Sequence, residues 1–165
     1  MDDLKNKKVI ITGGSRGIGY SILKEFYKKN SDILTIGSNL QNLENVKKDF
    51  PNIKIKQLDL KSSTDIKEQF PKLLDELGGL DILVNNAGMH IAKPFTEHEM
   101  DEFGHLMRVN VFSVFQLMQL AIIHMQKLGR GKIINIASVA GLRESMNSSA
   151  YNTSKHAVVG LTKCV

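Results

Sequence analysis

Strand-like and helix-like segments alternate along the whole chain, and this alternation constrains the fold more than any other feature. Short apolar runs rich in β-branched residues predict buried strands at 8–12, 33–36, 53–58, 81–84 and 132–137. Amphipathic stretches between them have apolar residues three or four positions apart, which is typical of helices. Parallel strands joined by right-handed crossovers accommodate this order. The sequence therefore predicts one α/β domain over residues 1–165, built on a doubly wound parallel sheet.

Capping residues place the helix boundaries. The first helix is expected over 17–30. Asn39 is suited to cap the second helix, and Gly78-Gly79 to end the third. Thr96 and Glu99 have the spacing of a capping box for a long fourth helix, which Gly129 would end. A last helix is expected to begin near Tyr151.

The long fourth helix is apolar around nearly its whole circumference. Such a helix must be buried on more than one side, so one side should face the sheet. The other side needs either another helix of the chain or a second subunit, which favours a homo-oligomer. Its most apolar part, 109–125, is interrupted by polar residues and predicts no membrane span. These polar residues are Asn110, Ser113, Gln116, Gln119 and His124.

Composition narrows the class of protein. With 42% hydrophobic and 24% charged residues, the 165-residue chain is typical of a folded globular domain. The net charge of +5 comes from dispersed lysines, so no nucleic-acid partner is expected. A single cysteine, Cys164, and an N-terminus without a secretory pattern favour the cytoplasm. The five histidines lack metal-ligand spacing, and no metal site is predicted. His90 is interpreted as a surface histidine, with the edge of a substrate pocket as the alternative.

A glycine-rich loop joins the first strand to the first helix. It reads Thr-Gly-Gly-Ser-Arg-Gly-Ile-Gly over residues 12–19. At such a turn, glycines let a pyrophosphate approach closely, and the helix N-terminus offers free N–H groups. A purely structural turn is the alternative, but the βαβ context favours phosphate binding.

The end of the second strand bears on which dinucleotide is bound. A carboxylate there would bind the ribose of NAD, yet the sequence is Gly37-Ser38-Asn39. Arg16 in the glycine loop can pair with a 2′-phosphate. The sequence therefore favours NADP(H), with NAD(H) as the alternative.

A tyrosine and a lysine four residues apart indicate proton-transfer chemistry. Tyr151 and Lys155 lie on one face of the last predicted helix. A free tyrosine has a pKa of about 10, and a nearby ammonium lowers the pKa toward the working range of a general acid or base. Ser138 and the segment 85–88 follow neighbouring strands at the same carboxyl edge, where open α/β sheets bind ligands.

Together these motifs resemble the short-chain dehydrogenase/reductase family, which has a Rossmann-like fold. The similarity includes the glycine loop, Asp59 after the third strand, the Asn-Asn-Ala-Gly segment at 85–88, and the Tyr-Asn-Thr-Ser-Lys segment at 151–155. The Arg16 form of the loop is most similar to NADP-using members, including 3-oxoacyl-carrier-protein reductases. The resemblance implies a catalytic set of Asn110, Ser138, Tyr151 and Lys155. It implies cofactor contacts at Gly13, Ser15, Arg16, Gly17, Ile18, Gly19, Ser38, Asn39, Asp59, Leu60, Asn86, Ala87, Gly88, Tyr151 and Lys155.

The resemblance also implies a reaction, in which a hydride moves between nicotinamide and a small-molecule carbonyl or secondary alcohol. Tyr151 would transfer the proton, Lys155 would assist it and bind the ribose, Ser138 would orient the carbonyl, and Asn110 would hold a relay water. Family members continue beyond this helix, so the chain is expected to be the cofactor and catalytic portion of a larger domain, with an exposed fifth strand. A nucleotide-binding module without catalysis and a truncated, marginally folded product are the alternatives.

Overall fold

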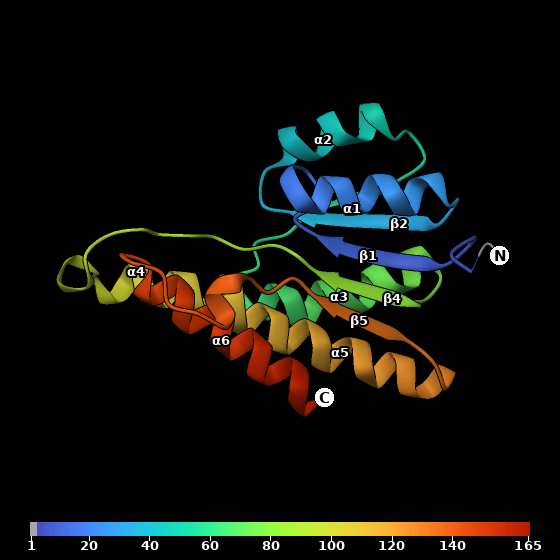
Figure 1. The fold of residues 1–165 in the computed structure, drawn as a ribbon. Helices are drawn as coiled ribbons and strands as arrows, with labels where there is room; N and C mark the ends of the chain where they lie inside the picture. Colours follow the sequence, from blue (N-terminus) through green and yellow to red (C-terminus); the bar gives the residue numbers. More distant parts are fainter. Residues whose placement is uncertain (1–2) are drawn as a thin grey trace.

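The computed structural model describes residues 3–165, and over them five strands form one parallel sheet (Figure 1). The strands are β1 (Lys8–Thr12), β2 (Asp32–Gly37), β3 (Lys54–Gln57), β4 (Ile82–Asn85) and β5 (Lys132–Asn135). Their order across the sheet is β3-β2-β1-β4-β5, and each neighbouring pair is parallel. The order reverses between β1 and β4, where open sheets of this kind bind ligands. The predicted doubly wound parallel sheet is confirmed.

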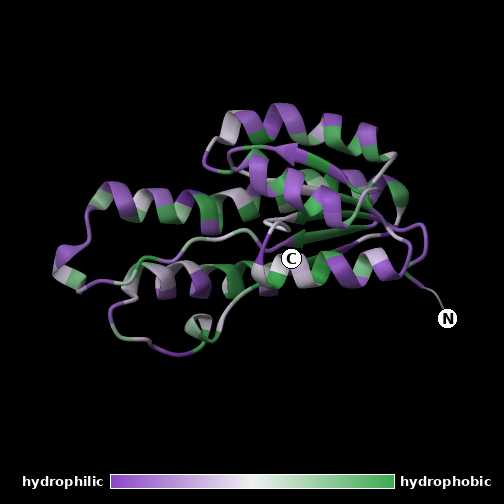
Figure 2. Ribbon diagram, turned by 90° about the horizontal axis from the view of Figure 1, so that it is seen from above, coloured by the Kyte–Doolittle hydropathy of each residue, from purple (hydrophilic) through white to green (hydrophobic). Residues whose placement is uncertain are grey.

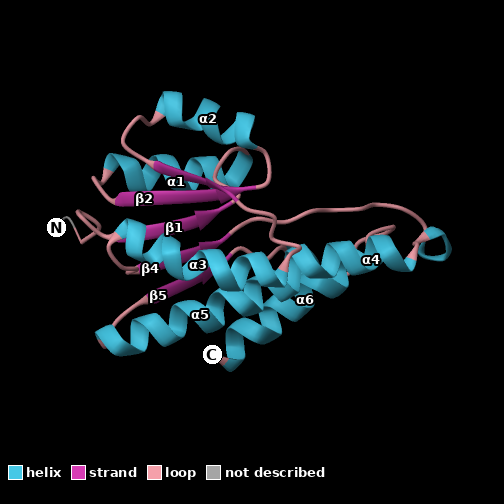
Figure 3. Ribbon diagram, turned by 180° about the vertical axis from the view of Figure 1, so that it is seen from behind, coloured by secondary structure: helices cyan, strands magenta, loops and turns pink. Residues whose placement is uncertain are grey.

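Helices cover both faces of this sheet (Figure 3). Helices α1 (Gly17–Lys28) and α2 (Leu40–Asp49) pack on one face, and α3 (Ser63–Leu77) and α5 (Ser113–Leu128) on the other. Alternate residues of β1 point to opposite faces of the sheet. Val9 and Ile11 therefore pack with α1 and α2, while Ile10 packs with α3 and α5. The apolar colouring concentrates in the strands and the inward sides of the helices (Figure 2). Burial on both faces explains why the strands are continuous apolar runs.

Several element boundaries differ from the sequence-based expectation. Helix α1 ends at Lys28, because Asn30 has a φ of 57° and leaves the helical region. The expected capping box at Thr96 and Glu99 is wrong. Thr96 lies in a short 3-10 turn, η1 (Phe95–Glu97). The helix begins only at Met100, with Glu99 as its N-cap residue, and Glu102 Oε2 accepts a hydrogen bond from the Glu99 backbone N at 3.4 Å. Strand β5 ends at Asn135, before the expected 137.

The long apolar helix is divided into two α-helices. Helix α4 (Met100–Met107) passes through a π-helical turn, η2 (Arg108–Phe112), into α5. Inward residues of α5 pack on α3 and β4, and α6 (Ser149–Cys164) packs against α4 and the π turn. Phe112, Phe115 and Ile123 are more than half exposed. The expectation of burial on two sides therefore holds for part of the circumference.

By length and hydropathy alone, the run Met100–Leu128 would suffice to cross a membrane. Of its most apolar window, 39% is buried inside the structure. A core helix of a soluble protein passes the same length and hydropathy test.

The loops after β4 and β5 extend beyond the sheet toward α4 (Figure 1). The loop after β5 contains a second 3-10 turn, η3 (Val139–Gly141), and leads into α6 two residues before the expected start. A backbone hydrogen bond from Lys93 N to Asn147 O, 2.8 Å long, joins the two loops. Both loops leave the carboxyl edge of the sheet, which places their residues beside the glycine loop.

Candidate cofactor and catalytic site

The glycine loop needs glycine at three positions because its backbone packs closely against neighbours. A Cβ on Gly13 would lie 2.9 Å from Ala87 Cα. A Cβ on Gly14 would lie 2.3 Å from Thr35 Oγ1, which accepts a hydrogen bond from Gly14 N at 3.2 Å. A Cβ on Gly19 would lie 2.2 Å from the carbonyl oxygen of Gly13. Gly13 itself has a φ of 70°, in the left-handed region that favours glycine.

Hydrogen bonds fasten this loop to the segment after β4. Thr12 Oγ1 accepts from the backbone N of Asn86 and of Ala87, both at 3.0 Å. Asn86 Nδ2 donates in return to the carbonyl oxygens of Thr12 and Gly13, each at 3.0 Å. The two segments that the sequence assigned to the cofactor are therefore one rigid unit at the point where the strand order reverses.

The N-terminus of α1 is suited to a phosphate. The residue before the helix, Arg16, is extended, and among residues 3–165 no side chain caps this end. The first turn carries no acidic residue. Free N–H groups and the positive end of the helix dipole therefore favour an anion here, which fits the pyrophosphate of a dinucleotide.

A cleft of about 1060 Å³ opens beside this helix end. Three predicted cofactor residues do not line it: Gly19, which is buried in the first turn of α1, and Tyr151 and Lys155 of α6. The predicted cofactor residues that do line it are Gly13, Ser15, Arg16, Gly17, Ile18, Ser38, Asn39, Asp59, Leu60, Asn86, Ala87 and Gly88. Residues not predicted also line it: Gly37, Asn42, Gln57, Leu58, Lys61, Met89, His105 and Val109. The sequence gives no signal for most of these residues except that they lie close to the motifs along the chain.

The rim of the cleft is polar but carries no acid at the end of β2. Asn39 Oδ1 caps α2 by accepting from Asn42 N at 2.9 Å. Asp59 Oδ1 accepts from Lys61 N at 3.0 Å, and its other oxygen lies 3.5 Å from Lys61 Nζ. Arg16 is exposed and forms no ion pair within the described chain.

Asn110 lies in the π turn, buried, with its amide bonded to two segments. Its Oδ1 accepts from Met89 N at 2.8 Å, and its Nδ2 donates to Met89 O at 2.9 Å and to Ser154 Oγ at 3.0 Å. Single π turns inside α-helices are frequent at functional sites. This turn joins the segment after β4 to α6. The role of Ser154 was missed, because nothing in the sequence pairs it with Asn110.

Tyr151 and Lys155 share one face of α6, as their spacing predicts. Lys155 is buried, its Nζ donates to Ile136 O at 2.8 Å, and burial lowers the pKa of this lysine. The Nζ atom lies 5.6 Å from the centroid of the Tyr151 ring. Ser138 precedes η3, and its Oγ accepts from Ala140 N at 3.2 Å.

Gly88 connects the cleft to Lys155 and Asn110. It lines the cleft, and a Cβ on it would lie 3.8 Å from Lys155 Nζ and 3.4 Å from Asn110 Oδ1. Two catalytic candidates therefore lie next to a residue that lines the cleft, although neither of them lines it. Within residues 3–165, no group of three acidic, histidine or cysteine side chains is placed to hold a metal.

Comparison with known proteins identifies the family. The model of the family described as short chain dehydrogenase matches residues 7–165. The 3alpha-hydroxysteroid dehydrogenase of Mediterraneibacter gnavus is 36% identical, with 97% of this chain and 66% of that protein covered. The 2-dehydro-3-deoxy-D-gluconate 5-dehydrogenase of Bacillus subtilis is also 36% identical, with 97% and 64% covered.

A solved structure agrees with the sequence relatives. The crystal structure of a putative gluconate dehydrogenase from Agrobacterium tumefaciens superposes with a TM-score of 0.92 at 29% identity, covering 99% of this chain and 66% of that one. The chain thus spans about two thirds of the length of these relatives. A match over nearly every residue, in sequence and in fold, confirms the resemblance: the chain belongs to the short-chain dehydrogenase family.

Proposed function

We propose that this chain carries the cofactor-binding and proton-transfer groups of an NADP(H)-dependent oxidoreductase acting on a carbonyl or secondary alcohol. One observation supports this most directly: Gly88 lies both on the wall of the cofactor cleft and beside Lys155 and Asn110. A dinucleotide held by the glycine loop would extend along this wall toward α6. Binding and proton transfer would then occur in one place.

The proposed chemistry divides between cofactor and protein. When bound, the nicotinamide supplies or accepts the hydride at the substrate carbon. In reduction, the Tyr151 hydroxyl donates its proton to the carbonyl oxygen, and in oxidation the phenolate takes a proton from the alcohol. The Lys155 ammonium stabilises the phenolate. Ser138 Oγ donates to the carbonyl oxygen and orients it. Asn110 Oδ1 has a second lone pair, which can hold a water of the proton relay.

The preference for NADP(H) rests on the cleft rim. Arg16 is exposed there and, among the described residues, has no carboxylate partner, so its guanidinium is free to pair with a 2′-phosphate. No acid at the end of β2 opposes that charge.

We further propose a homo-oligomer and a cytoplasmic setting. The exposed Phe112 and Phe115 border a hollow of about 410 Å³ beside Arg108 and Gln119, which a second copy would cover. On this proposal, the apolar run Met100–Leu128 serves packing between helices rather than crossing a membrane.

A cofactor titration combined with a turnover assay tests the function. We expect NADPH to bind more tightly than NADH, and Arg16→Ala to remove most of that difference, about 10- to 100-fold for a charge-assisted hydrogen bond. Lys24→Ala is the control, because Lys24 is exposed on α1 outside the cleft. Equal weakening of both cofactors in Arg16→Ala would contradict the phosphate role.

Turnover separates an enzyme from a nucleotide-binding module. With a panel of ketones and secondary alcohols, we expect hydride transfer in the wild type and its near loss in Tyr151→Phe, with NADPH affinity retained. Tight NADPH binding without turnover on any substrate would favour the module. Tyr151→Phe activity equal to wild type would remove Tyr151 from its role.

A further inference from the structure

The ring of His90 lies against the ring of Tyr151. Their centroids are 4.6 Å apart, and the planes meet at 63°, an edge-to-face arrangement. His90 comes two residues after Gly88, on the loop that follows β4. It therefore reaches the proposed proton donor from a different segment than Lys155 does.

Ser148 anchors the imidazole. His90 Nε2 and Ser148 Oγ are 3.0 Å apart, and Ser148 is buried with 4% of its surface exposed. The Ser148 hydroxyl also lies 3.3 Å from Met146 O, to which it can donate. A protonated Nε2 donates to Ser148 Oγ and leaves the hydroxyl hydrogen for Met146 O, whereas an unprotonated Nε2 accepts that hydrogen, so the serine holds the ring in either tautomer.

Ser148 holds His90 instead of capping helix α6. It precedes the first residue of α6, the N-cap position at which serine ordinarily caps the first turn, yet within the described chain its side chain makes no capping hydrogen bond. Tyr151 lies in that first turn, and uncapped helix ends fray. The serine is therefore used to hold His90 against the tyrosine rather than to hold the helix end itself.

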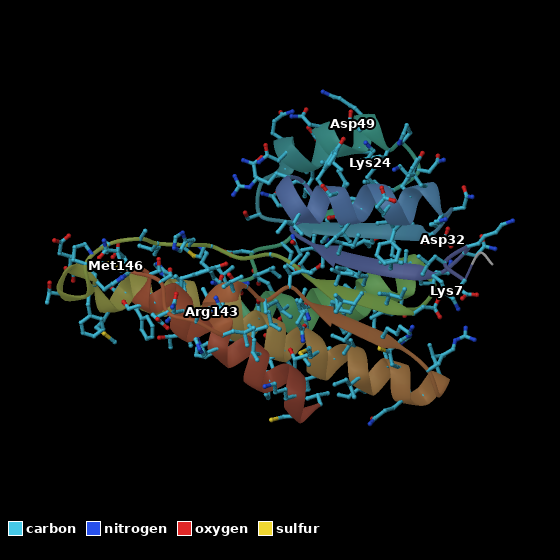
Figure 4. All side chains as sticks on the ribbon, in the orientation of Figure 1. Lys7, Lys24, Asp32, Asp49, Arg143 and Met146 are labelled. Carbon is cyan, nitrogen blue, oxygen red and sulfur yellow. The ribbon has the colours of Figure 1, made fainter. Side chains whose placement is uncertain are left out.

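The backbone around His90 is held as well. The preceding residue, Met89, has both its N and O bonded to the amide of Asn110. Further along, Lys93 N bonds Asn147 O, next to Ser148. Figure 4 places Met146, from this second loop, at the end of the molecule opposite Lys7. Two loops and the π turn thus fix His90 before any substrate binds.

We propose that His90 is a positioning residue, which holds the Tyr151 ring in the orientation for proton transfer and is itself anchored by Ser148. The role rests on the proposed function, since it acts through Tyr151. The sequence interpreted His90 as a surface histidine, with the edge of a substrate pocket as the alternative, and its side chain is exposed in the structure. Ser148 was not assigned to the site from the sequence.

Kinetics of matched variants tests the proposal. We expect His90→Ala to lower kcat about 10- to 100-fold, as misplacement of a reacting group does, with KM and NADPH affinity nearly unchanged. His90→Phe keeps an aromatic ring at this position and should recover part of the loss. As a single substitution, Ser148→Ala should lower kcat. In a His90→Ala background it should cause no further loss. His156→Ala, an exposed histidine of the same helix, should match the wild type.

A spectroscopic measurement tests the contact between His90 and Tyr151 without requiring turnover. The chain has three tyrosines, so Tyr151→Phe assigns the ring signals of 13C-tyrosine-labelled protein. We expect His90→Ala and Ser148→Ala to shift the Tyr151 signals and to leave those of Tyr20 and Tyr27 in place. Unshifted Tyr151 signals, or wild-type kcat in His90→Ala, would overturn the proposal. Absence of turnover in the wild type with NADPH bound would instead contradict the proposed function, and the ring signals would still test the contact.

Discussion

At the scale of single residues, Gly19 is the position where side-chain volume matters most for the cofactor. Even one methyl group would meet Gly13 O at 2.2 Å and Asn86 Nδ2 at 2.3 Å. The loop must then move away from the segment after β4, to which four hydrogen bonds now fasten it. The proposed phosphate site and the wall of the cleft are therefore coupled through this glycine.

Gly19→Ala should destabilise the fold by about 1–3 kcal/mol, the usual cost of overpacking, and should abolish NADPH binding. Gly160→Ala is the matched control, because Gly160 is also helical and, apart from the adjoining backbone of its own helix, no atom lies within 4 Å of its missing Cβ. There we expect a gain of up to about 1 kcal/mol from helix propensity. Urea denaturation and a cofactor titration measure both. NADPH affinity equal to wild type in Gly19→Ala would refute the coupling.

Lys155 makes stability depend on pH. Burial lowers the pKa of its ammonium below the ordinary 10.5, so the folded chain releases this proton at a lower pH than the unfolded chain. Between those two values, the unfolded state binds more protons, and stability rises with pH. Below that window, the folded chain carries the full cost of the buried charge.

We therefore expect the wild type to gain stability relative to Lys155→Met as pH rises from neutral toward 10.5. Urea denaturation across this range measures the difference in unfolding free energy. Lys163→Met, at an exposed position of the same helix, should show no such trend. A wild-type advantage that shrinks with rising pH would show that the lysine pKa is raised instead.

At the scale of elements, the α4–η2–α5 unit serves three tasks. Its inward face completes the core, its π turn places Asn110 between Met89 and Ser154, and its outer face exposes phenyl rings. A straight α-helix would carry the residues after Asn110 through a different rotation. The interruption therefore lets one apolar segment both pack on the sheet and hold the site.

The exposed outer face of this α4–η2–α5 unit can be tested as the surface through which two copies of the chain associate. Phe112→Glu with Phe115→Glu should convert a dimer or larger assembly to monomer, because charges would replace apolar surface at the contact. Leu128→Glu is the control. It is 49% exposed near the end of α5, on roughly the opposite side at about 100° per residue. Light scattering gives the mass. A wild-type chain that is already monomeric at working concentration would contradict the proposed interface.

At the scale of the whole molecule, cofactor binding should stabilise the fold. The cleft is formed by segments from β1, β2, β3 and β4 together with α4, so a ligand that fills it binds the folded state alone. NADPH at 100 times its Kd should add about 2.7 kcal/mol and raise Tm by about 5–10 °C. Scanning calorimetry checks this, and Gly19→Ala should lose the shift. An equal shift in both chains would place the nucleotide elsewhere.

The sequence by itself determined the architecture and predicted many of the residues that line the large cleft. Alternating periodicities fix the order of strands and helices, and a glycine loop between β1 and α1 can serve only at the carboxyl edge of the sheet. The family resemblance assigned twelve of the cleft-lining residues in advance. These features are local, because each depends on residues close together along the chain.

Tertiary structure alone decided the contacts between distant segments. Asn110 bonds Met89 and Ser154 across 21 and 44 positions, and Ser148 bonds His90 across 58. No periodicity encodes such pairs, and the serine before α6 would be interpreted from sequence as a helix cap. The sequence also predicted a capping box formed by Thr96 and Glu99, whereas Thr96 lies in a 3-10 turn and the helix begins after Glu99. Local propensity sets where elements form, whereas packing decides which side chains meet.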